Sequence, residues 1–256
     1  MLGGPRTSRT RKTNENKMGK AGRSTRKMAA KRRSAAFIYL LLAVSVAIVL
    51  IALSSNSQAL GITGLDLLGV IVVLGIVINI LKYQANRQFK AERRAVRGAR
   101  AEETIEDVLN ELGENFYALH DIRSPYGNID HIVLGQQSGI YLLETKAHGG
   151  KVEVLDSGLL VNGKPPEKDF IAQVLRNTYW LKEELKKISG ADVWITPVVI
   201  FTNTFVLPSK PVKGVVVVNK KYLANTLREG RPSATVARLW EMRGKVGEAL
   251  AQNRQR

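Results

Sequence analysis

Two long apolar runs near the N-terminus limit the folds that are open to this chain. Residues 35–53 (AAFIYLLLAVSVAIVLIAL) contain no charged side chain, and residues 65–81 (LDLLGVIVVLGIVINIL) contain only Asp66, near one end. Each run is long enough to cross a bilayer as a helix. The first run is too long, and the basic stretch before it too extended, for a cleaved secretory signal. We therefore predict two transmembrane helices within residues 34–82.

Basic residues flank this apolar pair on both sides. Residues 1–33 carry twelve Lys and Arg against one acidic residue, and residues 82–100 carry seven more. The connecting loop, residues 54–64, has no charge. The positive-inside rule therefore predicts a two-span protein of the cell membrane with both flanks, and so both termini, in the cytoplasm. A buried helical pair in a soluble core does not explain basic blocks on both sides.

The two basic segments are predicted to differ in structure. Residues 1–33 show no apolar period, which predicts a disordered basic tail. Residues 83–97 are predicted to form a basic juxtamembrane helix that lies against anionic lipid headgroups. Nucleic acid and anionic headgroups are both plausible partners for the tail, and the apolar run that follows it favours lipid.

The positive charge is concentrated in the N-terminal part of the chain. The net charge is +17, of which residues 1–100 supply +16 and residues 101–256 only +1. This distribution argues against a protein that coats nucleic acid along its whole length. The chain has no cysteine, which excludes a disulfide framework and a cysteine-based zinc site.

Hydrophobic periodicity predicts an α/β domain over residues 98–230 and a C-terminal helical segment over residues 231–256. Helices and strands alternate in an order typical of a mixed sheet flanked by helices. Residues 151–155 alternate and are expected to extend the antiparallel part of this sheet. The predicted strands are residues 116–121, 129–134, 140–143, 151–155, 158–161, 193–201 and 214–218, and the predicted helices are 102–112, 169–188, 222–228 and 236–251.

Three charged residues interrupt the predicted apolar hairpin over residues 128–151. Asp130 lies on its first strand, and Glu144 and Lys146 lie two apart on the second, so that their side chains share a face. Charges in such a place must be paired or must hold an ion. Two carboxylates and an ammonium suit Mg²⁺- or Mn²⁺-assisted phosphodiester hydrolysis. The alternative is a buried structural ion pair between lysine and a carboxylate.

Linked motifs across residues 98–230 resemble the NERD (nuclease-related) domain, a branch of the restriction-endonuclease-like PD-(D/E)xK superfamily. The helix start Gly98-Ala-Arg-Ala-Glu102 matches the family except for Ala101, where glycine is usual. The other matching motifs are Ile129-Asp130-His131, the run Gly139 to Lys146 with Glu144-Thr145-Lys146, Gly149-Gly150-Lys151-Val152, and the helical pair Gln173 and Asn177.

The resemblance implies a restriction-endonuclease-like fold with a metal-dependent nuclease site. Asp130 and Glu144 would bind Mg²⁺ (or Mn²⁺), with the Thr145 carbonyl as a third ligand. Lys146 would position the attacking water or stabilise the transition state. Two residues would complete the site, Glu102 from the first helix and Gln173 from the second. Ala101 affects a backbone position rather than the chemistry.

The histidines are expected to lie outside this site. His131 follows a ligand in a strand, so its side chain should point to the opposite face, where we predict a structural role. His120 and His148 are not assigned to the site.

The leading hypothesis is a membrane-anchored endonuclease that faces the cytoplasm and cleaves nucleic acid, with DNA preferred over RNA. The near-neutral charge of the domain stands against this hypothesis, because a nuclease needs a basic surface to bind phosphates. The basic juxtamembrane segment could supply that surface. One alternative is a catalytically silent NERD-fold binding or scaffolding module tethered to the membrane. Another alternative is an interaction protein whose basic tail binds nucleic acid near the membrane. Because many superfamily members act as dimers, the resemblance also admits a homodimer.

Overall fold

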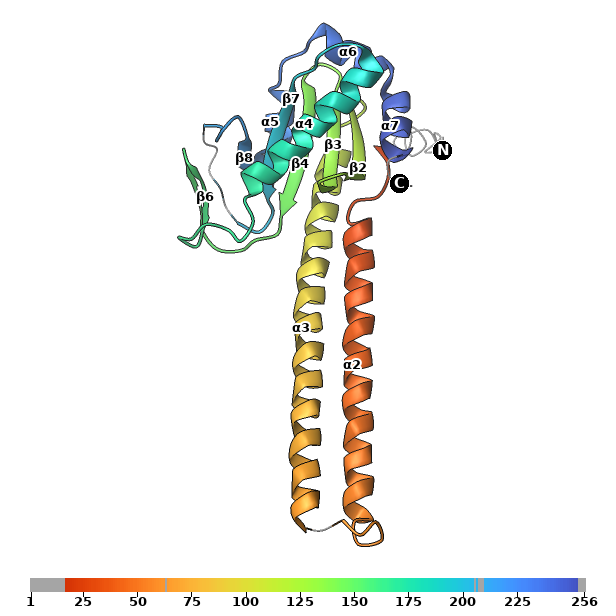
Figure 1. The fold of residues 1–256 in the computed structure, drawn as a ribbon. Helices are drawn as coiled ribbons and strands as arrows, with labels where there is room; N and C mark the ends of the chain where they lie inside the picture. The colour runs from red at the N-terminus through yellow and green to blue at the C-terminus, as the bar shows by residue number, and fades with distance from the viewer. Residues whose placement is uncertain (1–16, 63, 205, 207–209, 253–256) are drawn as a thin grey trace, which may run out of the picture. The chain divides into compact units, whose positions relative to one another are not determined.

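The chain divides into two compact units. The computed structural model describes residues 17–62, 64–204, 206 and 210–252. One unit is a hairpin of two long helices, Ser24–Arg97, and the other is an α/β domain made of the chain from Gly98 onward with the N-terminal segment that ends at Arg23 (Figure 1). The predicted α/β class is therefore confirmed, and the segment that precedes the first apolar helix belongs to the α/β unit.

The hairpin consists of α2 (Arg23–Ser55) and α3 (Gly64–Asn110), which contain the two apolar runs. Both helices are long and apolar enough to cross a membrane. The residues that α2 buries are alanines at seven-residue intervals, Ala29, Ala36 and Ala43. Small side chains at such a spacing let two helices approach closely. The large apolar side chains lie on the exposed surface instead, among them Phe37, Leu41, Ile51, Leu68 and Ile76.

The start of α2 corrects the prediction of a disordered tail. The helix begins at Arg23, so residues 23–33 are helical although their sequence has no large apolar stripe. Buried Ala29 explains this, because alanine has high helix propensity and needs no bulky partner side chain. Residues 1–16 of the predicted tail lie outside the described residues.

The predicted juxtamembrane helix, residues 83–97, is not a separate element. It continues α3 without a break and packs along α2. The rings of Phe37 and Phe89 meet edge to face with their centroids 5.8 Å apart. Arg32 Nη1 donates a hydrogen bond to the Ala91 carbonyl at 3.0 Å. One face of this basic segment is thus committed to its partner helix.

The domain is built on a mixed six-stranded sheet with strand order β1-β2-β3-β4-β7-β8. β2, β3 and β4 are antiparallel neighbours, whereas β4, β7 and β8 are parallel, and the two-residue β1 pairs in parallel with β2. The strand carrying the predicted site, β4, lies inside the sheet. The bounds are β1 (Lys17–Met18), β2 (Phe116–Ser124), β3 (Gly127–Gly135), β4 (Gly139–Lys146), β7 (Ile195–Phe201) and β8 (Val216–Asn219).

The prediction that residues 151–155 extend this sheet is wrong. Among the described strands, β5 (Val152–Leu155) pairs only with β6 (Gly158–Val161), and the two form a separate antiparallel sheet. The reason lies in the chain between β4 and β5, where Gly150 has φ +95°. A positive φ at glycine turns the backbone out of the extended conformation, so β5 does not continue the line of β4.

Helices cover both faces of the main sheet. On one face, α4 (Phe170–Ser189), α6 (Ala234–Glu241) and α7 (Arg243–Gln252) share a hydrophobic cluster with β2, β3, β4 and β7. On the other face, the C-terminal end of α3 and α5 (Lys220–Arg228) share a second cluster. The C-terminal segment, predicted as one helix, is two, because Met242 forms a cap between α6 and α7.

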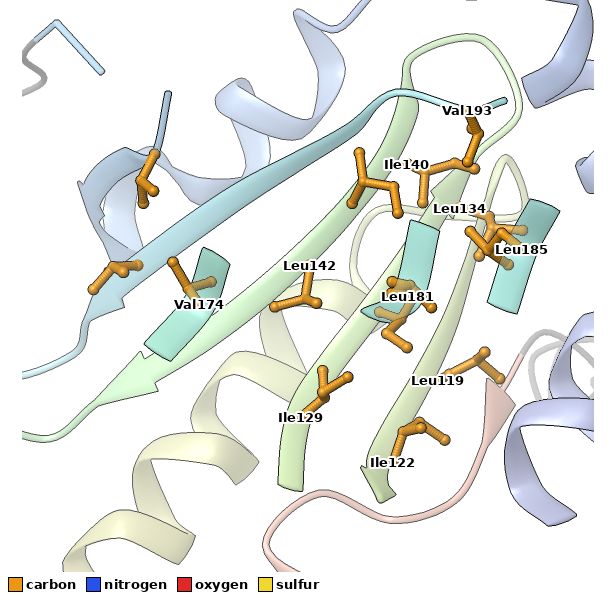
Figure 2. Close-up of a cluster of buried hydrophobic side chains, with 14 of the residues drawn as sticks. Leu119, Ile122, Ile129, Leu134, Ile140, Leu142, Val174, Leu181, Leu185 and Val193 are labelled. Carbon is orange, nitrogen blue, oxygen red and sulfur yellow. The ribbon is translucent and has the colours of Figure 1, made fainter. Parts of the chain in front are cut away.

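The amphipathic helix α4 anchors the larger core. Its apolar side chains Leu181 and Leu185 face strand residues such as Leu119 and Leu134 (Figure 2). The helix starts where Asp169 Oδ1 accepts a hydrogen bond from the Ala172 amide, and it ends at Gly190 in the left-handed conformation. This fixed start places the first turn of α4 beside the end of β4.

Candidate active site

Glu144, Lys146 and Gln173 come together where β4 ends. Lys146 Nζ lies 2.6 Å from Glu144 Oε1 and donates to Gln173 Oε1 at 3.1 Å. Gln173 Nε2 donates to the same Glu144 oxygen at 2.8 Å. The ammonium also sits 4.5 Å from the centroid of the Phe170 ring. The three polar side chains therefore form a closed set of contacts above the first turn of α4.

The second carboxylate oxygen of Glu144 is different. Glu144 is buried, and its Oε2 has no hydrogen-bond partner among the described residues. A buried carboxylate oxygen without a donor is costly. A cation bound at this oxygen would remove that cost.

Asp130 approaches the same strand from β3. Its Oδ2 accepts a hydrogen bond from the Thr145 amide at 2.6 Å. The β3–β4 ladder ends at the pair His131–Leu143, so the Asp130 side chain takes the place of the missing backbone partner. Because the amide and carbonyl of a strand residue project to the same side, the Thr145 carbonyl is directed toward Asp130 as well.

Negative charge accumulates around Asp130. The pKa of this half-buried carboxyl is raised well above its ordinary value by burial and by the charges of Glu144 and Glu102. The Thr145 amide and Lys146 act in the opposite direction. The charges of Glu144 and Glu102 thus act on Asp130, and a divalent cation would relieve this repulsion.

These residues fit a magnesium ion that keeps much of its hydration. In the part of the chain that the structure describes, no three His, Cys, Asp or Glu side chains form a ready metal-binding group. Mg²⁺ is usually held by one or two carboxylates and retains several waters. Asp130 and Glu144, whose Oε2 has no hydrogen-bond partner in the described part of the chain, supply two carboxylates, and the Thr145 carbonyl supplies one further oxygen.

Glu102 is held by a part of the chain that the sequence analysis did not connect with the site. It is buried on α3, and its Oε2 accepts a hydrogen bond from the Gly22 amide at 2.9 Å. The neighbouring Ala21 amide donates to Glu106 Oε2 at 3.1 Å. Residues 17–22, which we call the strap, therefore bind the helix that carries Glu102. No motif in the basic N-terminal sequence indicates these backbone contacts.

Gly22 is the residue on which the strap depends most. Its φ is +69°, and an added Cβ would lie 3.0 Å from the Ala99 carbonyl oxygen and 3.2 Å from the Ala99 Cβ. We expect Gly22→Ala to lower the stability of the domain by about 2–4 kcal/mol, because left-handed strain and overpacking add. Thermal unfolding of the full chain, followed by tryptophan fluorescence, measures this.

Gly190→Ala is the matched control for that experiment. Gly190 has φ +71°, and nothing lies within 4 Å of an added Cβ. Gly190→Ala should therefore lower the stability of the domain only by the left-handed backbone strain, about 1–2 kcal/mol. Equal losses of stability in the two variants would show that the close contact between Gly22 and Ala99 adds nothing to the destabilisation.

His131 lies outside the carboxylate cluster, as predicted. It is fully buried and faces His120 across the β2–β3 ladder, with their Nδ1 atoms 2.8 Å apart. Burial and the neighbouring His120 lower the pKa of His131 well below its ordinary value. A short contact between two ring nitrogens requires one to accept, so the pair forms a structural hydrogen bond between strands.

Two further polar residues near the site have structural contacts. Asn177, part of the predicted helical motif, is buried, and its Oδ1 accepts a hydrogen bond at 2.7 Å from the Oγ of Ser124, the last residue of β2. Asp121 was missed by the sequence analysis. It has φ +57°, and its Oδ1 accepts a hydrogen bond from the side-chain Nδ2 of Asn128. Left-handed backbone at aspartate is uncommon, and nothing in the strand-like sequence around it predicts the conformation.

A cavity of about 230 Å³ lies beside Phe170 and is lined also by Leu159, Pro165 and Asp169. Phe170 thus lines this cavity and also contacts the Lys146 ammonium through its ring. Of the described site residues, Asp130, Glu144 and Lys146 do not line the cavity itself.

Residues 97–202 match the family model of the nuclease-related domain. The chain carries a NERD domain. The match covers roughly two-fifths of the chain and includes every residue of the cluster described above. The mixed sheet of this NERD domain and its Asp130…Glu144-x-Lys146 pattern are consistent with the PD-(D/E)xK superfamily. The chain matches no curated protein and no solved structure.

Proposed function

We propose that this NERD domain is a Mg²⁺-dependent endonuclease held at a membrane by the α2–α3 hairpin. The observation that carries the proposal is the convergence of Glu144, Lys146 and Gln173 beside Asp130, with one buried Glu144 oxygen that has no hydrogen-bond partner among the residues described. Structural ion pairs do not usually leave a buried carboxylate oxygen unsatisfied.

Each residue of the cluster has a proposed role. Asp130, Glu144 and the Thr145 carbonyl hold Mg²⁺ or Mn²⁺. When bound, such an ion supplies Lewis-acid polarisation of the scissile phosphate. Lys146 offsets the negative charge that grows on the phosphate oxygens. Gln173 fixes the orientation of Lys146 and Glu144 by bonding to both.

Glu102 is proposed as the third carboxylate of the site. The charge of Glu102 contributes to the raised pKa of Asp130. The Gly22 amide of the strap donates a hydrogen bond to Glu102 Oε2 and so fixes the orientation of the carboxylate. Glu102 would hold the hydration water of the ion or receive a proton during the reaction.

The membrane assignment rests on the two apolar helices and their flanks. The strap and the chain from Gly98 onward belong to one unit, so both ends of the hairpin return to the same domain. This supports an even number of crossings. The basic flanks then favour the cytoplasmic side for the domain. DNA is the proposed substrate.

A second candidate is a silent NERD-fold binding module at the membrane. The close Lys146–Glu144 pair favours it, since a lysine at 2.6 Å neutralises the carboxylate without an ion. In this case the cluster would serve only to join β4 to α4.

A cleavage assay separates the two candidates. The full chain in detergent micelles is required, because the strap belongs to the domain and a fragment beginning near Arg97 would lose it. Supercoiled plasmid and single-stranded RNA are incubated with Mg²⁺, Mn²⁺ or EDTA. We expect metal-dependent plasmid cleavage that Asp130→Ala and Lys146→Ala both abolish. A folded wild-type chain that cleaves neither substrate supports the binding module.

A further inference from the structure

We infer that Phe170 is a positioning residue whose ring holds the Lys146 ammonium in its place beside the carboxylates. The inference rests on the proposed function, since it explains how the cation of that site is kept in position. Phe170 is the first residue of α4 and is buried. Lys146 Nζ lies over its ring, 4.5 Å from the centroid. An aromatic ring attracts a cation at this distance because its face carries partial negative charge.

The ring gives Lys146 a kind of contact that oxygen atoms do not give. An ammonium has three N–H donors. Among the described residues, two oxygens accept from it, Glu144 Oε1 at 2.6 Å and Gln173 Oε1 at 3.1 Å. A third oxygen would use the last donor, whereas the ring attracts the cation without offering an oxygen lone pair. The Lys146 side chain is 12% exposed, so its third donor remains available to a phosphate oxygen.

Glu144 is itself a proposed metal ligand, so its attraction for Lys146 depends on the ion. A carboxylate that shares its charge with a divalent cation attracts an ammonium less, and the ammonium is also repelled by that cation. Gln173 and Phe170 are uncharged, and their contacts with Lys146 do not weaken in this way. We therefore expect Phe170 to matter most when the site is loaded.

The first turn of α4 fixes Phe170 and Gln173 together. The two are three residues apart, which places their side chains on one side of the helix. Asp169 holds this turn, because its side chain accepts from the Ala172 amide and its carbonyl accepts from the Gln173 amide at 3.0 Å. The Phe170 ring also packs against the ring of Phe201, with the centroids 6.3 Å apart. The ring is therefore held in place independently of the ammonium.

A role in packing alone is the competing explanation for Phe170. This residue belongs to the larger hydrophobic cluster and lines the cavity of about 230 Å³, so a smaller side chain also lowers stability. Phe201 offers a matched comparison, because it is fully buried in the same cluster and pairs with Lys146 across the β4–β7 ladder. Its replacement loosens the same core beside Lys146 and leaves the Phe170 ring over the ammonium.

The first test probes Lys146 without any reaction of a substrate. The full chain in detergent micelles and EDTA is treated with acetic anhydride, and mass spectrometry follows acetylation of Lys146 relative to exposed Lys221. We expect Phe170→Leu to raise this relative rate about three- to tenfold, the size expected for loss of a cation–π contact. Phe170→Tyr keeps the ring and should be acetylated as wild type is, and so should Phe201→Leu. If Phe170→Leu does not fold, the more adaptable side chain of Phe170→Met takes its place.

The second test measures single-turnover cleavage of plasmid at saturating protein with Mg²⁺. We expect Phe170→Leu to slow cleavage about three- to tenfold, while Phe170→Tyr and Phe201→Leu cleave at close to the wild-type rate. In the Lys146→Met background, Phe170→Leu should cause no further loss, because the cation that the ring positions is already gone.

Three results would overturn the inference. They are acetylation of Lys146 in Phe170→Leu at the wild-type rate, an equal rise of acetylation in Phe201→Leu, and a further loss of cleavage on adding Phe170→Leu to Lys146→Met. The nuclease proposal fails separately. A wild-type chain that does not cleave, with acetylation raised by Phe170→Leu and not by Phe201→Leu, would contradict the nuclease and still support the positioning of Lys146 by Phe170.

Discussion

Replacing Lys146 with methionine is expected to slow metal-dependent cleavage at least about 100-fold while Mn²⁺ binds as tightly as before or more tightly. The substitution removes the cation that offsets charge in the transition state, and such contacts are worth about 10²–10³ in rate. It keeps the length of the side chain, and Gln173 Nε2 still donates to Glu144 Oε1 at 2.8 Å. The lost ammonium no longer repels a metal ion. Single-turnover cleavage and Mn²⁺ titration measure the two effects.

Lys151→Met is the control for this substitution. Lys151 directly precedes β5, is exposed, and pairs with Glu153 at 3.1 Å. Its replacement should leave both cleavage and Mn²⁺ affinity unchanged. If Lys146→Met loses metal binding and cleavage to the same degree, Lys146 supports the structure of the site and has no separate role in the reaction.

The second large effect is expected from Asp130→Asn, which should stabilise the metal-free domain while it destroys the metal site. Burial and the charges of Glu144 and Glu102 raise the pKa of Asp130, so the folded state holds this proton more tightly than the unfolded state. Stability is then lost as pH rises from about 4, the unfolded pKa, through the raised folded pKa. Asparagine removes that loss and still accepts the Thr145 hydrogen bond.

We expect a gain of about 1–2 kcal/mol at pH 7.5 in EDTA, or a rise of roughly 2–8 °C in Tm. The gain should shrink as the pH is lowered toward 5. The three tryptophans, Trp180, Trp194 and Trp240, all lie in the domain and report its unfolding. Mg²⁺ should raise the Tm of wild type but not that of the variant. A variant less stable than wild type at pH 7.5 would mean that the Asp130 charge is needed by the fold.

Much of the domain could be predicted because its local patterns agree with its packing. The strands β3 and β4 and the helix α4 follow their apolar periods, and each predicted site residue lies on the expected element. The spacing of two residues between Glu144 and Lys146 was enough to predict a shared face. The contact of both with Gln173 follows from α4 packing on that face of the sheet.

The errors have a common physical origin in backbone contacts that leave no side-chain pattern. The strap binds Glu102 and Glu106 through the backbone amides of Gly22 and Ala21, and every residue except proline carries such a donor, so the contact leaves no side-chain signal. The helical start of α2 depends on the packing of alanines, and a search for periodic large apolar residues does not detect alanines. β5 and β6 form a separate sheet after a connection in which Gly150 has positive φ, and a glycine in the sequence does not announce that conformation, since it is also common in continuous hairpins.

Binding of Mn²⁺ to the metal-free full chain is the most direct test of the proposed site. Electron paramagnetic resonance counts free and bound ions in wild type, Asp130→Asn and Glu144→Gln, with Asp192→Asn as a control carboxylate that pairs with Lys182 and Lys186 at the surface. The account predicts one tightly bound ion per chain in wild type and the control, and at least a tenfold weaker site in both cluster variants. Binding that is absent from folded wild type, or unchanged in both cluster variants, would contradict it.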